Sequence, residues 1–278
     1  MNMRIAATAS LNSQNSDPIL FSGPFEESIP EMARLGFTGA ELHIYDSEEI
    51  DRQKLFAVLK ENNMVLTSIG TGSAYERDGI CLGSQDAALR KEAVRRLEGH
   101  MKTAAPSHGI VIIGLIAGRF CDCGGDEEKF IYYLKEGLKK CAGLAGRYGV
   151  KLGFEVTNRF ESDFGTTIRE AQRLIHEIGD SNLGLHIDTV HMNIEEMDIG
   201  AAIRQGAGDI VHVHIAETNR RHPGCGHYNF PETLRALQEI GYGGALALEI
   251  CPWPDCRTAA RKSLNYLRAI LQAIGEAQ

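Results

Sequence analysis

The chain has 278 residues, of which 43% are hydrophobic and 24% charged, and its formal net charge is −8. These values are ordinary for a globular protein and exclude the disordered and fibrous classes. A negative net charge without a dense Lys/Arg cluster argues against a nucleic-acid partner. The longest nearly continuous apolar run, 109–118, is about ten residues and too short to cross a bilayer, so we expect no membrane association.

The cysteine pattern argues against a zinc ribbon. Seven cysteines are scattered along the chain, and none forms a Cys-x2-Cys pair. Residues 1–12 lack the apolar stretch of a secretory signal peptide and are typical of a short strand. We therefore expect a reducing, cytoplasmic location.

Short aliphatic runs alternate with longer segments of helical periodicity. The predicted strands are 3–8, 38–44, 64–70, 109–116, 150–156, 183–188, 209–215 and 244–250. The predicted helices are 26–35, 51–62, 86–103, 127–147, 167–178, 231–240 and 257–275, with one short helix expected within 189–208. The glycines that follow helical segments predict helix ends, and they are Gly36, Gly149, Gly179 and Gly241.

Eight strand-and-helix units predict an α/β fold with a parallel sheet that is buried on both faces. Units of about 35 residues match a (β/α)8 TIM barrel, which has about 250 residues. A doubly wound open sheet has the same alternation, but the count of eight favours the barrel. Because no linker or change of composition divides the sequence, we expect one domain over residues 1–278.

Polar residues interrupt the apolar strands at the ends where a barrel carries its chemistry. Consecutive predicted strands bring Glu155, Asp188, His214 and Glu249 to the same mouth. A buried carboxylate costs several kcal/mol unless it is paired, protonated or bound to a cation. Three carboxylates and one imidazole suit a hard divalent ion, Mn²⁺ or Mg²⁺, better than a thiolate-type zinc site.

Two simpler interpretations compete with this metal site. A single acid at a strand end is more often a salt-bridge partner or a helix N-cap, but four on successive strands favour a shared cation. His212 and His214 face the same side of their strand, so alternation does not choose between them. His214 lies nearer the strand end and is the predicted ligand, while His212 is assigned to the core beneath it.

Long segments around these residues resemble motifs of the D-tagatose 3-epimerase (ketose 3-epimerase) family of xylose isomerase-like barrels. They are GFEVTNRFESDF, HIDTVHMNIEE and HVHIAETNRRHPGCGHYNF, and LALEICPW matches the segment that bears the family's last metal ligand. The predicted ligands are separated by 33, 26 and 35 residues, which agrees with the family. Three further segments, IGTGSAYERDGICL, VIIGLIAGR and NRRHPGCGHYNF, are similar to a branch that acts on a keto sugar acid, 5-keto-L-gluconate epimerase.

The resemblance implies a TIM barrel with one divalent ion, with Mn²⁺ favoured over Mg²⁺ or Co²⁺. Its ligands would be Glu155, Asp188, His214 and Glu249. It also implies that Glu155 and Glu249 are the acid/base pair that inverts a carbon next to a ketone through a cis-enediolate. The substrate would be a small sugar or sugar acid.

Further residues are implied as substrate contacts or pocket walls. His191 and Arg220 would bind substrate oxygens, and Glu161 would bind an oxygen or orient those two residues. We also expect Arg119 to pair with a substrate carboxylate and His227 to contact the substrate from the PGCGH turn. Glu41 and His43 are predicted to line the pocket, and Asn158 to brace the loop around it.

Three other functions remain open from the sequence. An aldose–ketose isomerase uses a related enediol on the same scaffold, although the NRFE and HMNIEE segments favour an epimerase. An endonuclease of the apurinic-site type shares the barrel, but it needs more metal ligands and a basic groove. A non-catalytic sugar-binding protein would not need the acid/base pair. A homo-oligomer is compatible with the sequence, which does not fix the number of subunits.

Overall fold

The computed structural model describes residues 3–276, in which strands and helices alternate along the chain. The strands are β1 (Arg4–Ser10), β2 (Phe21–Ser22), β3 (Gly39–His43), β4 (Val65–Gly70), β5 (Ile110–Ile113), β6 (Lys151–Glu155), β7 (Leu183–Asp188), β8 (Ile210–Ile215) and β9 (Ala245–Leu248). The helices are α1 (Phe25–Leu35), α2 (Arg52–Glu61), α3 (Ser73–Asp78), α4 (Ala87–Ala104), α5 (Glu127–Tyr148), α6 (Ile168–Ile178), α7 (Thr189–Glu195), α8 (Ile199–Gln205), α9 (Phe230–Glu239) and α10 (Cys256–Glu276).

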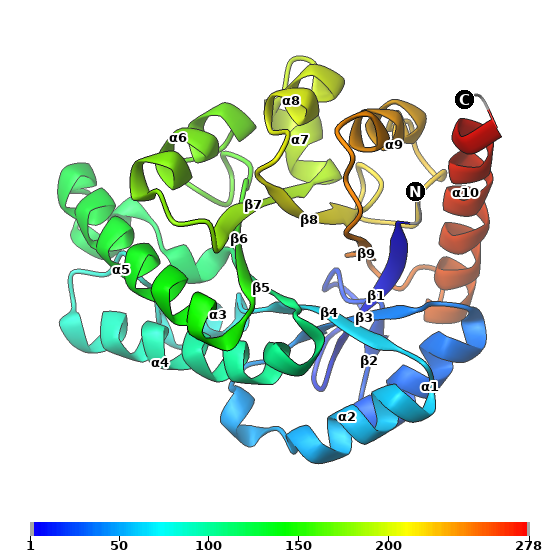
Figure 1. Ribbon diagram of the computed structural model, residues 1–278, viewed down its shortest axis with the longest axis horizontal. Coiled ribbons are helices and arrows are strands. Elements are labelled where there is room, and N and C mark those ends of the chain that lie inside the picture. The colour runs from blue at the N-terminus through cyan, green and yellow to red at the C-terminus, as the bar shows by residue number, and fades with distance from the viewer. Residues whose placement is uncertain (1–2, 277–278) are drawn as a thin grey trace.

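The strands form a closed parallel barrel surrounded by helices (Figure 1). Neighbours follow the order β1-β3-β4-β5-β6-β7-β8-β9, and β9 pairs with β1 to close the ring. The two-residue strand β2 pairs with Ala9 and Ser10 at the end of β1. The predicted (β/α)8 TIM barrel is confirmed, and the carboxyl ends of all strands meet at one mouth.

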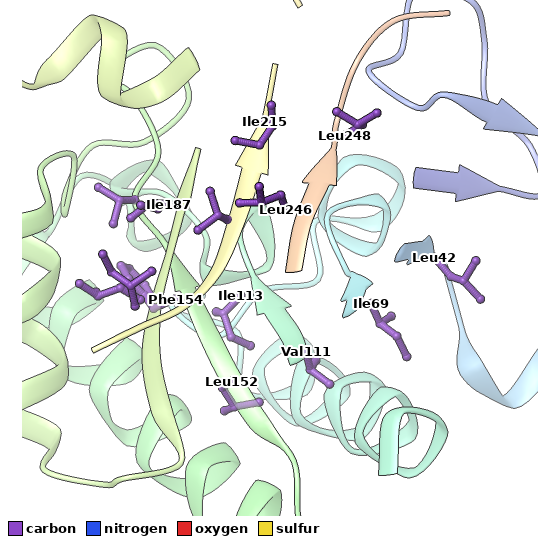
Figure 2. Packing of buried hydrophobic residues seen from close by; sticks show 14 of the residues in the cluster. Leu42, Ile69, Val111, Ile113, Leu152, Phe154, Ile187, Ile215, Leu246 and Leu248 are labelled. Atoms are coloured by element: carbon purple, nitrogen blue, oxygen red, sulfur yellow. The ribbon is translucent and has the colours of Figure 1, made fainter. Parts of the chain in front are cut away.

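Two-residue alternation along the strands separates an apolar outer face from a polar interior. Figure 2 shows buried apolar side chains of the strands, among them Leu152 and Phe154 of β6. These two residues belong to the large buried cluster that also contains residues of the helices. The alternate positions of β6–β9 carry Glu155, Asp188, His214 or small residues such as Ala247, which belongs to a separate small cluster. The same alternation that packs the helices therefore turns the polar side chains inward.

Helix boundaries follow from capping residues. Asp126 and Thr167 accept backbone N–H groups at the starts of α5 and α6. Gly36, Gly149 and Gly179 end helices with φ of 106°, 65° and 69°, in the left-handed region that favours glycine. These glycines were predicted to end helices, and the prediction is confirmed.

The structure differs from the sequence prediction at the barrel mouth. The segment 189–208 contains two short helices, α7 and α8, where one was expected, and β2 and α3 were not predicted. α7 begins directly after β7 because an Asp188 Oδ1 accepts the Val190 N–H at 2.6 Å. One carboxylate thus ends a strand and caps a helix.

No helix among residues 3–276 has the length and apolar character needed to cross a membrane.

A buried histidine in α4 makes a testable contribution to pH-dependent stability. His100 is completely buried with Nδ1 2.6 Å from Ser47 Oγ, and burial lowers the pKa of His100 to about 4. The unfolded chain binds this proton near the ordinary value of about 6.5, so stability decreases as the pH falls from about 6.5 to about 4. In His100→Asn, the loss of unfolding free energy between pH 7 and pH 5 should be smaller by about 2 kcal/mol. Urea denaturation of both proteins measures this, and equal losses would contradict it.

Candidate metal centre and active site

A cavity of about 500 Å³ opens at the carboxyl ends of the strands. Its walls come from the ends of β1, β3, β4, β5, β6, β8 and β9 or the loops after them and from α7 after β7, so residues distant in sequence meet there. The predicted site residues that line it are Glu155, Glu161, His191, His214, Arg220 and Glu249.

Two overlapping groups of potential ligands meet at Asp188, which is completely buried at the end of β7. In one group Asp188 lies with His214 and Glu249, and in the other with Glu155 and His191. Within each group one ligand atom per residue lies within 4.8 Å of the others. The structure therefore brings together all four residues that the sequence predicts as ligands.

The unpaired ring nitrogen of His214 fits a metal ligand. Its Nε2 lies 2.8 Å from Glu41 Oε1, while its buried Nδ1 has no hydrogen-bond partner within residues 3–276. Nδ1 lies 3.4 Å from Glu249 Oε2 and 3.8 Å from Asp188 Oδ2. When Nε2–H donates to Glu41, the Nδ1 lone pair faces two carboxylates, an arrangement that a cation between them would stabilise. An oxygen-rich donor set with one imidazole fits a hard divalent ion.

Glu41 orients this imidazole from the barrel interior. Its side chain is completely buried and accepts Ser68 Oγ–H at 2.6 Å. His43, His212 and His214 place Nε2 at 2.9, 2.7 and 2.8 Å from its carboxylate. β3 and β8 are not neighbours in the sheet, so these contacts cross the inside of the barrel. Glu41 lies beneath the cavity rather than in its wall, whereas His43 lines it, and His212 occupies the deeper position expected for it.

Arg220 links two of the carboxylates. Its Nη1 donates to Asp188 Oδ2 at 2.6 Å and to Glu249 Oε2 at 2.7 Å. Burial alone would raise the pKa of Asp188, but the charge of Arg220, together with His191 and His214, holds that pKa well below its usual range. The backbone of Arg220 has φ of 58°, a left-handed conformation that costs a non-glycine residue about 1–3 kcal/mol. Its carbonyl accepts the Cys251 N–H at 2.7 Å, which helps to hold that conformation.

Imidazoles surround the other predicted acid/base residue. Nε2 of His186 and Nε2 of His191 each lie 3.6 Å from Glu155 Oε1. Burial alone would raise the pKa of Glu155, but these two rings hold it well below its usual range. Glu155 is therefore ionised at neutral pH, as a metal ligand or a general base must be.

Asn158 braces this part of the site from the loop after β6. Its Nδ2 donates to His191 Nδ1 at 2.7 Å and to Glu161 Oε1 at 3.1 Å. Because Nδ1 of His191 accepts, its N–H is at Nε2, where it faces Glu155. Glu161 itself is half-exposed and lines the cavity.

Two residues that were expected to contact the substrate do not line the cavity. The guanidinium of Arg119 donates to the carbonyls of Phe160 and Glu161 at 2.6 and 3.0 Å. His227 is exposed, and its backbone N–H donates to Glu217 Oε1 at 3.2 Å. The substrate contacts expected of Arg119 and His227 therefore stay predictions.

His186 belongs to the site but was not predicted. It lies two residues before Asp188 on β7, and its completely buried ring stands beside those of His212 and His214. The two-residue spacing from Asp188 was the signal that could have found it.

A family model of xylose isomerase-like TIM barrels matches residues 29–270. The chain belongs to this family. It is 31% identical over 239 residues to the D-psicose 3-epimerase of Agrobacterium fabrum, which covers 82% of this chain and 80% of that protein. It is 30% identical over 233 residues to the D-psicose 3-epimerase of Ruminiclostridium cellulolyticum, with 80% and 76% covered.

Solved structures agree with these sequence relatives. An L-ribulose 3-epimerase structure has a TM-score of 0.83 and 25% identity over 99% of this chain and 97% of the other. D-Psicose 3-epimerase with D-tagatose from Clostridium cellulolyticum has a TM-score of 0.82 and 25% identity over 97% and 99%. The chain is thus an isomerase of the epimerase class.

The absence of a side chain at Gly114 leaves space for the Glu155 carboxylate. Substitution of this glycine therefore tests the place of Glu155 in the site. A Cβ at Gly114 would overlap Glu155 Oε2, whereas a Cβ at Gly72, another glycine of the cavity wall, would lie 3.6 Å from Leu115. Gly114→Ala should displace the carboxylate and weaken Mn²⁺ affinity by about tenfold or more, while Gly72→Ala should change it little. Titration of each folded variant with Mn²⁺, followed by the EPR signal of the free ion, measures the affinities. Equal affinities would contradict the placement of Glu155 in the metal site.

Proposed function

We propose that the protein is a metal-dependent 3-epimerase of free ketoses, with Glu155 and Glu249 as its acid/base pair. The positions of these glutamates, on β6 and directly after β9, support the proposal most strongly. The strands between them in the barrel, β7 and β8, supply Asp188 and His214. Two carboxylates therefore flank the group of potential metal ligands within one cavity.

The proposed reaction needs a base on each side of the carbon being inverted. Glu155 takes the C3 proton from one face, and Glu249 delivers a proton to the opposite face of the planar enediolate, with the roles exchanged in the reverse direction. A divalent ion held by Glu155, Asp188, His214 and Glu249 would supply positive charge to the substrate oxygens as the enediolate forms.

The remaining polar groups hold the substrate and the acid/base pair in place. Arg220 donates to Glu249 and keeps that carboxylate at the cavity wall. His191 presents Nε2–H at the same wall, within reach of a substrate hydroxyl and fixed by Asn158. The names of the relatives, D-psicose 3-epimerase and L-ribulose 3-epimerase, support C3 as the carbon that is inverted.

The charges of the cavity favour an uncharged substrate over a sugar acid or sugar phosphate. Its acidic lining residues are Asp17, Glu76, Glu155, Glu161 and Glu249. Among the described residues that line it, Arg220 is the one arginine or lysine, and its guanidinium is already shared by two carboxylates. Arg119, the cation expected for a substrate carboxylate, donates to backbone carbonyls instead. A free ketose is therefore preferred to the keto sugar acid suggested by the sequence.

Hydrogen exchange at C3 tests the proposal directly. The Mn²⁺-loaded protein in D₂O should exchange the C3–H of D-psicose, D-fructose or L-ribulose and convert the sugar to its C3 epimer. A 5-keto-hexonate should react at least about tenfold more slowly, and Glu155→Gln should lower epimerisation by about a hundredfold or more. NMR follows both the label and the epimer.

Two controls make the result specific. Treatment with EDTA should abolish exchange, and added Mn²⁺ should restore it. Label at C1 with formation of an aldose would instead support an aldose–ketose isomerase. A protein that binds Mn²⁺ at this site but exchanges no ketose C–H would contradict the proposed reaction.

A further inference from the structure

His186 is a buried imidazole of the site with both ring nitrogens unpaired among the described residues. It is completely buried on β7, and among residues 3–276 neither its Nδ1 nor its Nε2 has a hydrogen-bond partner. The rings beside it differ, since His212 and His214 each place Nε2 on Glu41. An imidazole carries at least one N–H, and leaving such a donor unpaired in the interior costs about 1–3 kcal/mol.

The carboxylate of Glu155 is an acceptor close to this donor. The register of β6 and β7 pairs Glu155 with His186, and the separation of Nε2 from Glu155 Oε1 is 3.6 Å. The other sides of the ring face His214 and His212, at centroid distances of 4.1 and 5.0 Å. A shift of roughly 0.5 Å would bring the Nε2–H and the carboxylate into ordinary hydrogen-bond distance.

We propose that His186 is a positioning residue that donates its Nε2–H to Glu155 and holds that carboxylate on its face of the substrate. This inference rests on the proposed epimerase function. It concerns one of the two acid/base residues, because Glu249 is held by different groups. Arg220 Nη1 donates to Glu249 at 2.7 Å, and His214 Nδ1 lies 3.4 Å from the same oxygen.

Because different groups hold Glu155 and Glu249, loss of the His186 donor should slow proton transfer on one face of the substrate only. Without the His186 donor, the Glu155 carboxylate is less well placed, and proton transfer between Glu155 and C3 slows. Proton transfer between Glu249 and C3 on the opposite face is retained. A general weakening of the fold or of metal binding would slow both transfers alike.

Three substitutions of His186 distinguish the effect of losing the N–H donor from the effect of losing the volume of the ring. His186→Gln places an N–H near the position of Nε2, whereas His186→Asn places its amide near Nδ1, which does not face Glu155. His186→Met fills the space without a donor. We expect epimerisation to fall by about 10–100-fold in H186N and H186M and to stay within about tenfold of wild type in H186Q, as for loss and retention of a carboxylate's hydrogen-bond partner.

The decisive readout is exchange in D₂O, measured separately for each member of the C3 epimer pair that wild type interconverts. With H186N or H186M, the epimer whose C3–H faces Glu249 should still take up deuterium without inversion, so its ratio of exchange to epimerisation rises about tenfold or more. The other epimer should exchange slowly. Circular dichroism and Mn²⁺ titration show that each variant is folded and holds its ion.

Distinct results overturn this inference and the proposed function. Equal slowing of exchange for both epimers, or equal activity of H186N and H186Q, would overturn the positioning role while the epimerase function stands. The Gln and Asn variants keep a polar side chain, so their comparison decides the question even if H186M fails to fold. Absence of C3 exchange in the wild-type protein would instead overturn the proposed function, and this inference with it.

Discussion

The charged groups at the barrel mouth depend on one buried carboxylate, that of Glu41. A completely buried carboxylate costs several kcal/mol unless it is paired and hydrogen-bonded. Here Ser68, His43, His212 and His214 all contact it from β3, β4 and β8. In return it fixes the ring of His214 so that Nδ1 faces Asp188 and Glu249. Glu41, inside the barrel, thereby orients His214, a potential metal ligand at the barrel mouth.

The arrangement of Asp188, Glu249 and Arg220 at the mouth reflects the same need to balance buried charge. Asp188 and Glu249 are buried beside each other, and Arg220 donates to both from a backbone conformation that L-residues rarely adopt. A bound divalent ion would be a second source of positive charge to balance the buried carboxylates of the site. With such an ion bound, the cavity would still carry more negative than positive charge, and this supports the uncharged substrate that we propose over an anion.

Much of the barrel and the meeting of the candidate ligands could be predicted from the sequence because a simple regularity determines them. Strands of parallel sheets end at the same edge, so Glu155, Asp188 and Glu249 had to meet if the fold was a barrel. Loop positions follow no such rule. The contacts of Arg119 with the Phe160 and Glu161 carbonyls could not be predicted, because these carbonyls lie 41 and 42 residues away in sequence. His186 was overlooked because a histidine within an apolar strand resembles a core residue until its neighbours are known.

In the proposed site, Glu155, Asp188, His214 and Glu249 hold one divalent ion at the barrel mouth. Anomalous diffraction from crystals of the Mn²⁺-loaded protein tests it most directly. We expect a single strong peak in the cavity, within coordination distance of the three carboxylates and of His214 Nδ1. A peak among His186, His212 and His214, coordination through His214 Nε2 or no peak at saturating Mn²⁺ would contradict it.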